Sequence, residues 1–315
     1  MLVRVAVALA CVLTLGACGR APAEPESKAP SPTKPAKPAP AKPRPAKPKP
    51  RTPLDADGAL VPSNLGEAVK KVDRLGSTRG ARLFGADLGW PQCPKGMGIK
   101  HKETLGAPMP TEAARFVIIG LTNGPSFTPN PCLRDQVAWA RQRKLLTAAY
   151  AVVSWPHQKT VDAMGGAGSR LDQLRTVGRK AAAYTITQMR GAGLNSPIVW
   201  VDVEPVNHYE WSGTTQEQAA VVEGTIAGYR DAGLRVGVYS TPAMYRAIVG
   251  DLRLGVPEWR AAGQTSMAEA LSRCGDDWSI AGGPGVFGQW VEDNRDRNVT
   301  CPGVDLRLGD YFQKF

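Results

Sequence analysis

The sequence predicts an α/β fold, a (β/α)8 TIM-type barrel that can be irregular, and three observations support this prediction. Eight short apolar segments with the character of strands follow one another between residues 83 and 308. Helical patterns separate several of them, which is typical of a parallel sheet with crossover helices. About 235 residues hold the eight segments, a size typical of one such barrel. A doubly wound open sheet is the alternative, although no G-x-G-x-x-G motif follows the first segment to indicate a dinucleotide site.

The expected strands are short and rich in Val, Ile, Trp and Tyr, as buried strands are. In chain order they cover residues 83–87, 116–120, 147–153, 198–204, 235–240, 258–263, 286–290 and 304–308. Two helices are also indicated. One is expected within residues 131–144, where apolar residues recur with helical spacing. The other follows a capping box formed by Thr214 and Glu217 and ends at Gly233.

The first eighteen residues have the features of an export signal. Arg4 precedes an apolar run too short to span a bilayer comfortably, and the run ends in Leu-Gly-Ala-Cys. This ending resembles the bacterial lipobox, which implies a lipoprotein signal peptide over residues 1–17, cleavage before Cys18 and lipidation of the Cys18 thiol. An uncleaved anchor and an ordinary signal peptide are the alternatives. A lipid anchor would hold the protein outside the cytoplasm, on the outer face of the cell membrane.

A lipidated N-terminus and a disordered Pro/Lys-rich linker are expected over residues 18–78, and one barrel domain over residues 79–315. Between Gly19 and Pro53, Pro alternates with Ala and Lys, a composition that favours extended polyproline II and builds no core. This stretch has nine basic and two acidic residues, so with Arg4 it accounts for +8 of the net charge of +11. The remaining +3 gives little support for nucleic acid as a partner, and none is expected.

Four cysteines remain once two are assigned to the signal peptide and the lipid anchor. In an oxidising compartment an even number indicates two disulfides. Three pairings are possible, and the preferred one joins neighbours in chain order, Cys93–Cys132 and Cys274–Cys301. A four-cysteine zinc site competes with this interpretation, but the sequence has neither C-x-x-C nor H-x-x-x-H spacing. We therefore expect no metal and no cofactor.

The segment IVWVDVEP, residues 198–205, places Asp202 and Glu204 at the end of an otherwise apolar strand. In a (β/α)8 barrel the C-terminal ends of the strands surround the active site. Residues two positions apart point to the same side, about 7 Å apart along the strand. One such carboxyl group can protonate a leaving oxygen while the other stabilises positive charge, so the pair suits cleavage of a glycosidic bond. The alternative is that both acids pair with Arg or cap a helix.

Further motifs occur in order along the chain: GADLGWPQC, FVIIGLTNG, IVWVDVEP, VGVYST, PEWRAAG, FGQW and GVDLRL. Over residues 82–315 this ordered set resembles glycoside hydrolase family 25, the lysozyme-type muramidases, and the actinobacterial lipoprotein domains related to it. The resemblance implies a barrel glycosidase that acts on the β-1,4 bond of peptidoglycan glycan strands. It also implies that Glu204 is the general acid and that the other site carboxylates are Asp202, Asp87 and, less directly, Asp305.

The chain departs from the family pattern at two strand ends. Residues 120–124 read Gly-Leu-Thr-Asn-Gly where family members carry Lys and Glu, and Tyr150 lacks the His-Phe that usually follows it. These changes leave open a second hypothesis, a glycan-binding envelope protein that no longer cleaves. Substrate contacts, or for the aromatic rings a place in the core, are expected for Gln92, Tyr150, Tyr239, Trp259, Gln289 and Trp290. A monomer is expected, with peptidoglycan or a related cell-wall glycan as its partner.

Overall fold

The computed structural model describes residues 82–315. The predicted signal peptide, the lipidation site at Cys18, the linker and the domain boundary at residue 79 lie outside the described residues. Within the described part, none of the helices combines the length and the apolar character that a membrane span requires.

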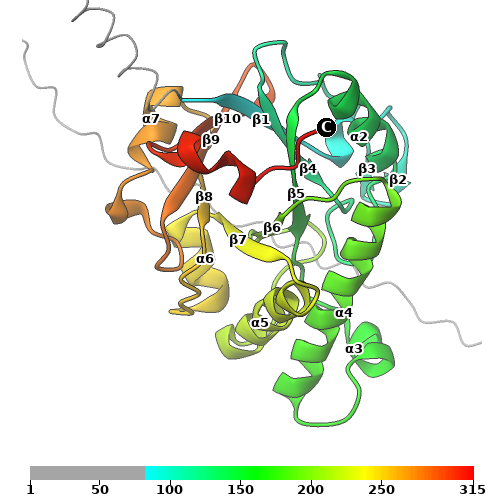
Figure 1. Ribbon diagram of the computed structural model, residues 1–315. Helices are drawn as coiled ribbons and strands as arrows, with labels where there is room; N and C mark the ends of the chain where they lie inside the picture. The colour runs from blue at the N-terminus through cyan, green and yellow to red at the C-terminus, as the bar shows by residue number, and fades with distance from the viewer. Residues whose placement is uncertain (1–81) are drawn as a thin grey trace, which may run out of the picture. The chain divides into compact units, whose positions relative to one another are not determined.

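Eight strands close into a barrel (Figure 1). They are β1 (Phe84–Leu88), β4 (Phe116–Gly120), β5 (Leu146–Val152), β6 (Ile198–Asp202), β7 (Arg235–Ser240), β8 (Glu258–Ala261), β9 (Gly285–Glu292) and β10 (Arg295–Thr300). Seven of them run parallel, whereas β10 pairs antiparallel with both of its neighbours, β9 and β1. The predicted α/β barrel is confirmed, and it is irregular.

Helices join most of the parallel strands. They are α2 (Leu133–Gln142), α3 (Gln158–Met164), α4 (Arg170–Gly191), α5 (Thr215–Asp231), α6 (Pro242–Val249) and α7 (Met267–Ser272). Both predicted helices form, as α2 and α5, and the hydroxyl of Thr214 accepts a hydrogen bond from the backbone N–H of Glu217 as the capping box requires. The connection from β1 to β4 is different, because it holds the 3-10 helix η1 (Trp90–Gln92) and a hairpin of β2 (Gly98–Ile99) and β3 (Lys102–Glu103).

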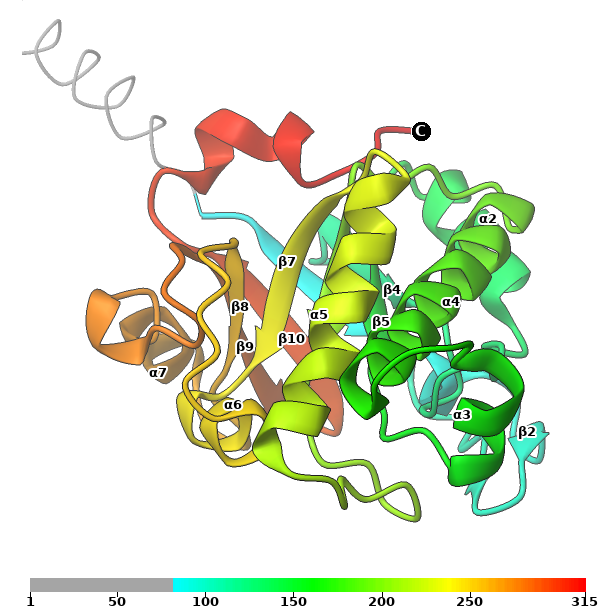
Figure 2. The same cartoon turned by 90° about the horizontal axis from the view of Figure 1, so that it is seen from below.

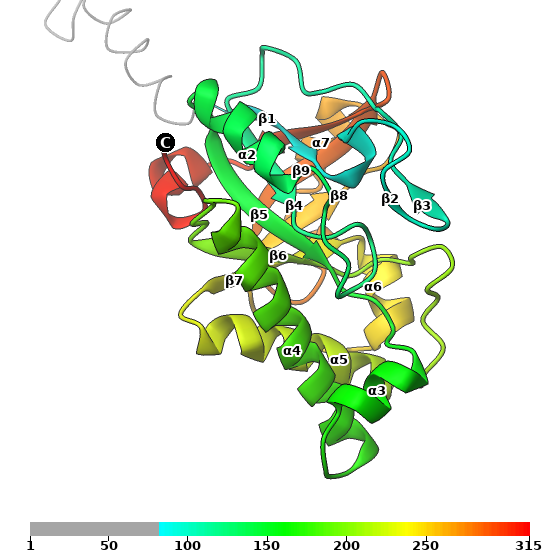
Figure 3. The same cartoon turned by 90° about the vertical axis from the view of Figure 1, so that its right-hand side faces the viewer.

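The long helices α4 and α5 lie side by side against the barrel (Figures 1 and 3). A glycine on each helix allows this close approach. A Cβ on Gly178 would collide with the backbone oxygen of Val221, and a Cβ on Gly224 would collide with that of Arg175. Any larger residue at either position would push the two backbones apart.

Alternation along the strands sorts the buried side chains into two layers. On β6, Val199 and Val201 pack among the residues that meet the helices, whereas Ile198 and Trp200 belong to the cluster inside the barrel. Trp200 packs there against Phe287 and other rings that fill the interior, as bulky side chains do in barrels of this size. By the same alternation Asp202, two positions after Trp200, also points inward, and it lies at the C-terminal end of β6.

The prediction that residues 304–308 form the eighth strand is wrong. Val304–Asp310 forms the 3-10 helix η3, and β10 closes the barrel instead. A tight turn makes the β9–β10 hairpin possible, because Asp293 and Asn294 adopt the left-handed backbone that such turns require. After η3, Gln313 pairs with Thr147 near the start of β5, so η3 covers the N-terminal ends of the parallel strands. Figure 2 shows η3, in red, at one end of the barrel and β2 at the other.

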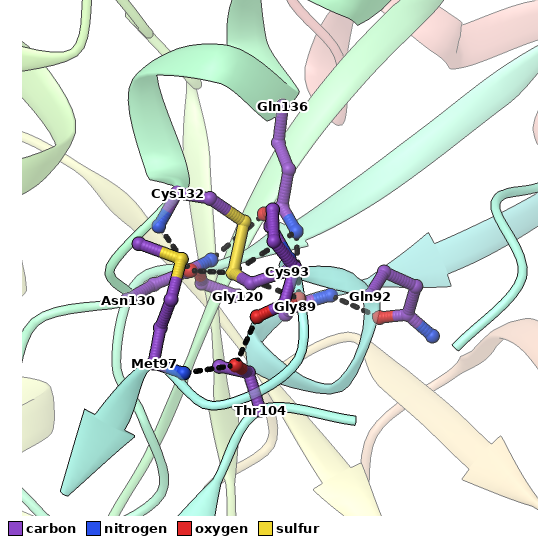
Figure 4. The surroundings of a disulfide bond; sticks show 10 residues. Gly89, Gln92, Cys93, Met97, Thr104, Gly120, Asn130, Cys132 and Gln136 are labelled. Atoms are coloured by element: carbon purple, nitrogen blue, oxygen red, sulfur yellow. Dashed lines mark hydrogen bonds between the residues drawn. A yellow bond between two sulfur atoms is a disulfide. The ribbon is translucent and has the colours of Figure 1, made fainter. Parts of the chain in front are cut away.

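Both predicted disulfides, Cys93–Cys132 and Cys274–Cys301, are confirmed. The first joins the segment after η1 to the start of α2 (Figure 4). Buried amides support it, since Asn130 Nδ2 donates to the Gly120 oxygen at 2.8 Å and Gln136 Nε2 donates to the Gly89 oxygen at 2.6 Å. The disulfide and these hydrogen bonds attach the segment between β1 and the hairpin to the barrel.

Replacing Cys93 and Cys132 together with Ala is expected to lower the free energy of unfolding by about 2–4 kcal/mol, because the unfolded chain loses the cross-link. Urea unfolding without reductant measures the change. The matched variant removes Cys274 and Cys301, whose loop is shorter, at a sequence separation of 27 against 39. It should lose a similar or slightly smaller amount. Unchanged urea midpoints in both variants would contradict a stabilising role.

Candidate active site

A cavity of about 360 Å³ opens where the parallel strands end. Four carboxyl groups line it, together with aromatic rings and one ammonium group. The carboxyls are those of Asp87, Asp202, Glu204 and Asp296, the rings are those of Trp90, Tyr150, Tyr239 and Trp259, and the ammonium is that of Lys102. Within residues 82–315, no three His, Cys, Asp or Glu side chains are grouped so that they could hold a metal ion.

Strand direction explains how carboxyls from distant parts of the chain meet. Asp87 lies near the end of β1, Asp202 is the last residue of β6, and Glu204 follows two positions later. Asp296 lies near the start of β10, whose antiparallel direction brings its N-terminal end to the same side of the barrel. The structure therefore brings together Asp87, Asp202 and Glu204 as predicted, and adds Asp296.

Asp87 is held by two amides from neighbouring strands. Its Oδ1 accepts hydrogen bonds from Asn298 Nδ2 at 2.7 Å and from Gln289 Nε2 at 3.1 Å. Each amide is oriented in turn, because Trp259 Nε1 donates to Asn298 Oδ1 at 2.7 Å and the Tyr239 hydroxyl donates to Gln289 Oε1 at 2.8 Å. Three of the predicted substrate contacts thus also fix the position of a carboxyl group.

Burial raises the pKa of all four carboxyl groups. The pKa of Asp202 is raised well above its usual value by burial and then by the nearby charges of Glu204 and Asp87. Burial also raises the pKa of Glu204, although the ammonium of Lys102 acts in the opposite direction. Burial followed by the charge of Asp296 raises the pKa of Asp87, and burial raises that of Asp296 itself. Such groups titrate as a coupled set and do not all ionise near neutral pH.

Asp202 and Glu204 differ in access. Asp202 is 3% exposed, and its Oδ1 has no hydrogen-bond partner among the described residues. Glu204 is partly exposed, and its backbone oxygen accepts a hydrogen bond from Trp211 Nε1 at 3.0 Å, which fixes the chain after β6. A ligand in the cavity therefore reaches the carboxyl group of Glu204 more readily than that of Asp202, whose Oδ1 is buried.

Tyr150, Tyr239, Trp259 and Gln289 line the cavity as predicted, but Gln92 and Trp290 do not. The side chain of Gln92 accepts a hydrogen bond from the backbone N–H of Gly89 at 2.8 Å and so caps η1. Trp290 follows the inward-facing Gln289 and therefore points outward. It is buried beside Ala270 of α7 and Val299, where only protein surrounds it.

Asp305 is the third predicted site residue, after Gln92 and Trp290, that lies away from the cavity. It lies on η3, which covers the N-terminal ends of the parallel strands, and it does not line the cavity. The prediction assumed that residues 304–308 form the last strand and that its residues lie at the mouth. Because β10 is the strand that closes the barrel, Asp296 takes the late position that the resemblance assigned to Asp305.

Sequence reasoning missed two charged residues of the cavity, Asp296 and Lys102, and the aromatic ring of Trp90. A partial signal for Asp296 exists, since Asp293-Asn294 follows the strand-like segment 286–290 and these residue types suit a tight hairpin turn, but the polar residues after them do not have the pattern of a strand. No comparable signal exists for Lys102, which lies in the long connection between β1 and β4. Only the folded hairpin shows where that lysine lies.

One comparison with known proteins agrees with the motifs, and another finds no match. No model of a known protein family matches the chain. A curated protein from Dictyostelium discoideum, described as a probable glycoside hydrolase family 25 lysozyme, is 31% identical over 78 residues, which cover 24% of this chain. The match spans about a third of that relative, 35% of its length. It confirms that the domain is similar to family 25.

Two solved structures are similar in outline. A family 25 glycosyl hydrolase of Streptococcus pneumoniae is 13% identical, with a TM-score of 0.47, over 78% of this chain and 100% of that one. A family 25 lysozyme from Aspergillus fumigatus is 12% identical, with a TM-score of 0.45, over 74% of this chain and 100% of that one.

Proposed function

We propose that this chain is a cell-envelope glycoside hydrolase that cleaves the β-1,4 bond of peptidoglycan glycan strands. One observation carries the proposal: Asp202 and Glu204, both with raised pKa values, line one cavity with Asp87, Asp296 and several aromatic rings. Cleavage of a glycosidic bond needs a carboxyl group that keeps its proton near neutral pH beside one that ionises. The similarity to family 25 supports the same activity.

In the proposed reaction Glu204 is the general acid. Its carboxyl group gives a proton to the glycosidic oxygen while the bond between that oxygen and the anomeric carbon breaks, and the bonding electrons stay with the oxygen. Water then adds to the anomeric carbon and its proton returns to Glu204. Glu204 lines the cavity and its side chain is partly exposed, which supports this role.

Asp202 and Asp87 are proposed to assist. Asp202 lines the cavity, and its carboxyl group suits a hydrogen bond from the acetamido N–H of the sugar or from the attacking water. When ionised, Asp202 would also stabilise the positive charge that develops at the anomeric carbon. Asp87 is held firmly by Asn298 and Gln289, so it adds a carboxyl group of fixed position on the other side of the cavity.

The aromatic rings would shape the space for the sugar. The Tyr239 and Trp259 rings lie 4.4 Å apart at their centroids, and Tyr150 meets Trp259 edge to face. Rings held in this way give apolar surfaces that match the C–H faces of pyranoses, and they exclude water from the charged groups. The half-buried ring of Trp90 also lines the cavity, with the Lys102 ammonium 5.0 Å from its centre.

We also propose that the chain acts outside the cytoplasm as a lipoprotein. The export signal, Cys18 and the Pro/Lys-rich segment support this proposal from the sequence alone. The composition of residues 19–53 predicts an extended polyproline II chain, and a chain of that length would let an anchored barrel reach glycan strands on the order of 100 Å from the membrane.

The proposal is tested with purified peptidoglycan, by chemical identification of the new reducing ends. We expect the protein to release reducing ends, and borohydride reduction followed by hydrolysis should yield the reduced form of muramic acid. Reduced glucosamine would show that the other β-1,4 bond is cut. Sedimentation of the protein with the walls and no release of ends would favour the alternative, a glycan-binding protein on a barrel that does not cleave. Heat-denatured protein is the control.

A further inference from the structure

Lys102 reaches the cavity from outside the barrel strands. It begins β3, in the hairpin inserted between β1 and β4, and its side chain lines the same cavity as Asp202 and Glu204. Among the described residues that line this cavity, Lys102 carries the only positive charge. The four carboxyl groups therefore face one ammonium group.

The neighbouring loop holds Lys102 in place. Asn123 Nδ2 donates a hydrogen bond to the backbone oxygen of Lys102 at 2.8 Å, and the ammonium lies 5.0 Å from the centre of the Trp90 ring. The aliphatic part of the side chain passes over Gly124, where an added Cβ would lie 2.6 Å from Lys102 Cδ. Asn123 and Gly124 thus hold the backbone and the side chain of the lysine in place. They belong to residues 120–124, a segment without charged residues.

The charges of the cavity act on Lys102 from several elements. Burial lowers its pKa, whereas Glu204 and Asp202 at the end of β6 raise it. The converse also holds, since Lys102 lowers the pKa of both Asp202 and Glu204. Two more carboxyls of the same cavity, those of Asp87 on β1 and Asp296 on β10, complete the acidic side.

Other titratable groups lie nearby. Tyr150 and Tyr239 line the cavity, but their pKa values are raised by burial first and then by the carboxylates, so they stay neutral. The hairpin itself carries Lys100, His101 and Glu103, and the His101 ring stacks on that of His208 at 4.8 Å. None of these three hairpin residues lines the cavity, so Lys102 alone brings a charge from the hairpin to the acid pair.

We propose that Lys102 is a positioning residue for the acid pair. Its ammonium group is the positive charge that lets one carboxyl of Asp202 and Glu204 ionise while the other keeps its proton. This role rests on the proposed function, since glycosidic cleavage needs one ionised and one protonated carboxyl group. The charge comes from an inserted hairpin and not from a barrel strand, and Asn123 and Gly124 hold the lysine in position.

Carbon-13 NMR titration of the Asp and Glu carboxyl carbons tests the proposal without any substrate. Removing the cation in Lys102→Met destabilises both ionised carboxylates, so the titration midpoints of Asp202 and Glu204 should rise by about one pH unit or more. Lys102→Arg keeps the charge and should stay near the parent protein. The matched control is Lys100→Met, which removes an exposed charge from the same hairpin and should leave both midpoints unchanged.

Midpoints in Lys102→Met and Lys102→Gln that equal those of the parent protein would overturn the proposal. Amide spectra of each variant show whether the barrel is intact, and the neutral Gln variant provides a second measurement if Met disturbs the hairpin. Because the titration needs no turnover, its result does not depend on whether the protein hydrolyses peptidoglycan. If the protein cleaves peptidoglycan, both limbs of the pH–rate profile of Lys102→Met should also move to higher pH.

Discussion

Glu204→Gln is expected to slow the hydrolysis of purified peptidoglycan by about 10²- to 10⁴-fold, the usual contribution of a general acid. The amide has nearly the same shape as the carboxyl group but no proton to give at the required acidity. Binding should persist, because the cavity and its aromatic rings are unchanged. Release of reducing ends, measured beside sedimentation with the walls, separates the two effects.

Asp305→Asn is the matched control, since it also replaces a carboxyl group with an amide. The sequence had predicted Asp305 as a site carboxylate too. Asp305 lies on η3, away from the cavity, so its variant should cleave at the parent rate. A slow Asp305 variant beside a fully active Glu204 variant would reverse the assignment. Equal activity of the Glu204 variant and the parent protein would show that Glu204 is not the acid.

The second large effect is expected for stability, in Glu258→Ala. Glu258 on β8 is fully buried and forms an ion pair with Arg260, whose Nη2 lies 2.7 Å from Glu258 Oε2. The same carboxylate accepts backbone N–H bonds from Ile280 at 2.8 Å, Ala281 at 2.7 Å and Gly283 at 2.9 Å. One side chain thus organises the loop that leads from α7 to β9.

Removing Glu258 leaves a buried charge without its partner. Arg260 would still donate to the backbone oxygens of Arg273 and Gly275, at 2.7 and 2.5 Å, but its net charge would be uncompensated. Breaking one side of a buried ion pair costs about 3–5 kcal/mol. Urea unfolding of Glu258→Ala should show a loss of that size.

Glu269→Ala is the control for this prediction, because it also breaks a Glu–Arg pair. Glu269 lies 2.8 Å from Arg273, but its side chain is 41% exposed. Exposed pairs contribute about 0–1 kcal/mol, so this variant should unfold close to the parent protein. Equal losses in the two variants would show that burial of the Glu258 pair is not the cause.

Local pattern was sufficient for much of the fold and for part of the site. Apolar runs predicted seven of the eight barrel strands, because strands buried on both faces consist mostly of apolar residues. The two-residue period of a strand put Asp202 and Glu204 on the same side, and both reach the cavity. Export indicated two disulfides, and the preferred one of three possible pairings is the one that forms. The inferences on the strands and on the acid pair depend only on neighbours in the chain.

The remaining features depend on pairing across the chain. β10 is polar along much of its length, so its place in the barrel is decided by its hydrogen bonds to β9 and β1, and with it the place of Asp296. Trp290 faces α7 because β9 is set in register with its neighbours.

By itself the sequence determined the barrel and three of the carboxyls at its mouth, since periodicity and order are local properties, and it favoured one disulfide pairing among three. Only the tertiary structure decided which strand closes the barrel, which late aspartate enters the cavity and where Lys102 meets the acid pair. Those outcomes depend on contacts between residues far apart in the chain. The place of Lys102 is the clearest case, because its backbone oxygen is held by Asn123, 21 positions away, and no local pattern indicates this contact.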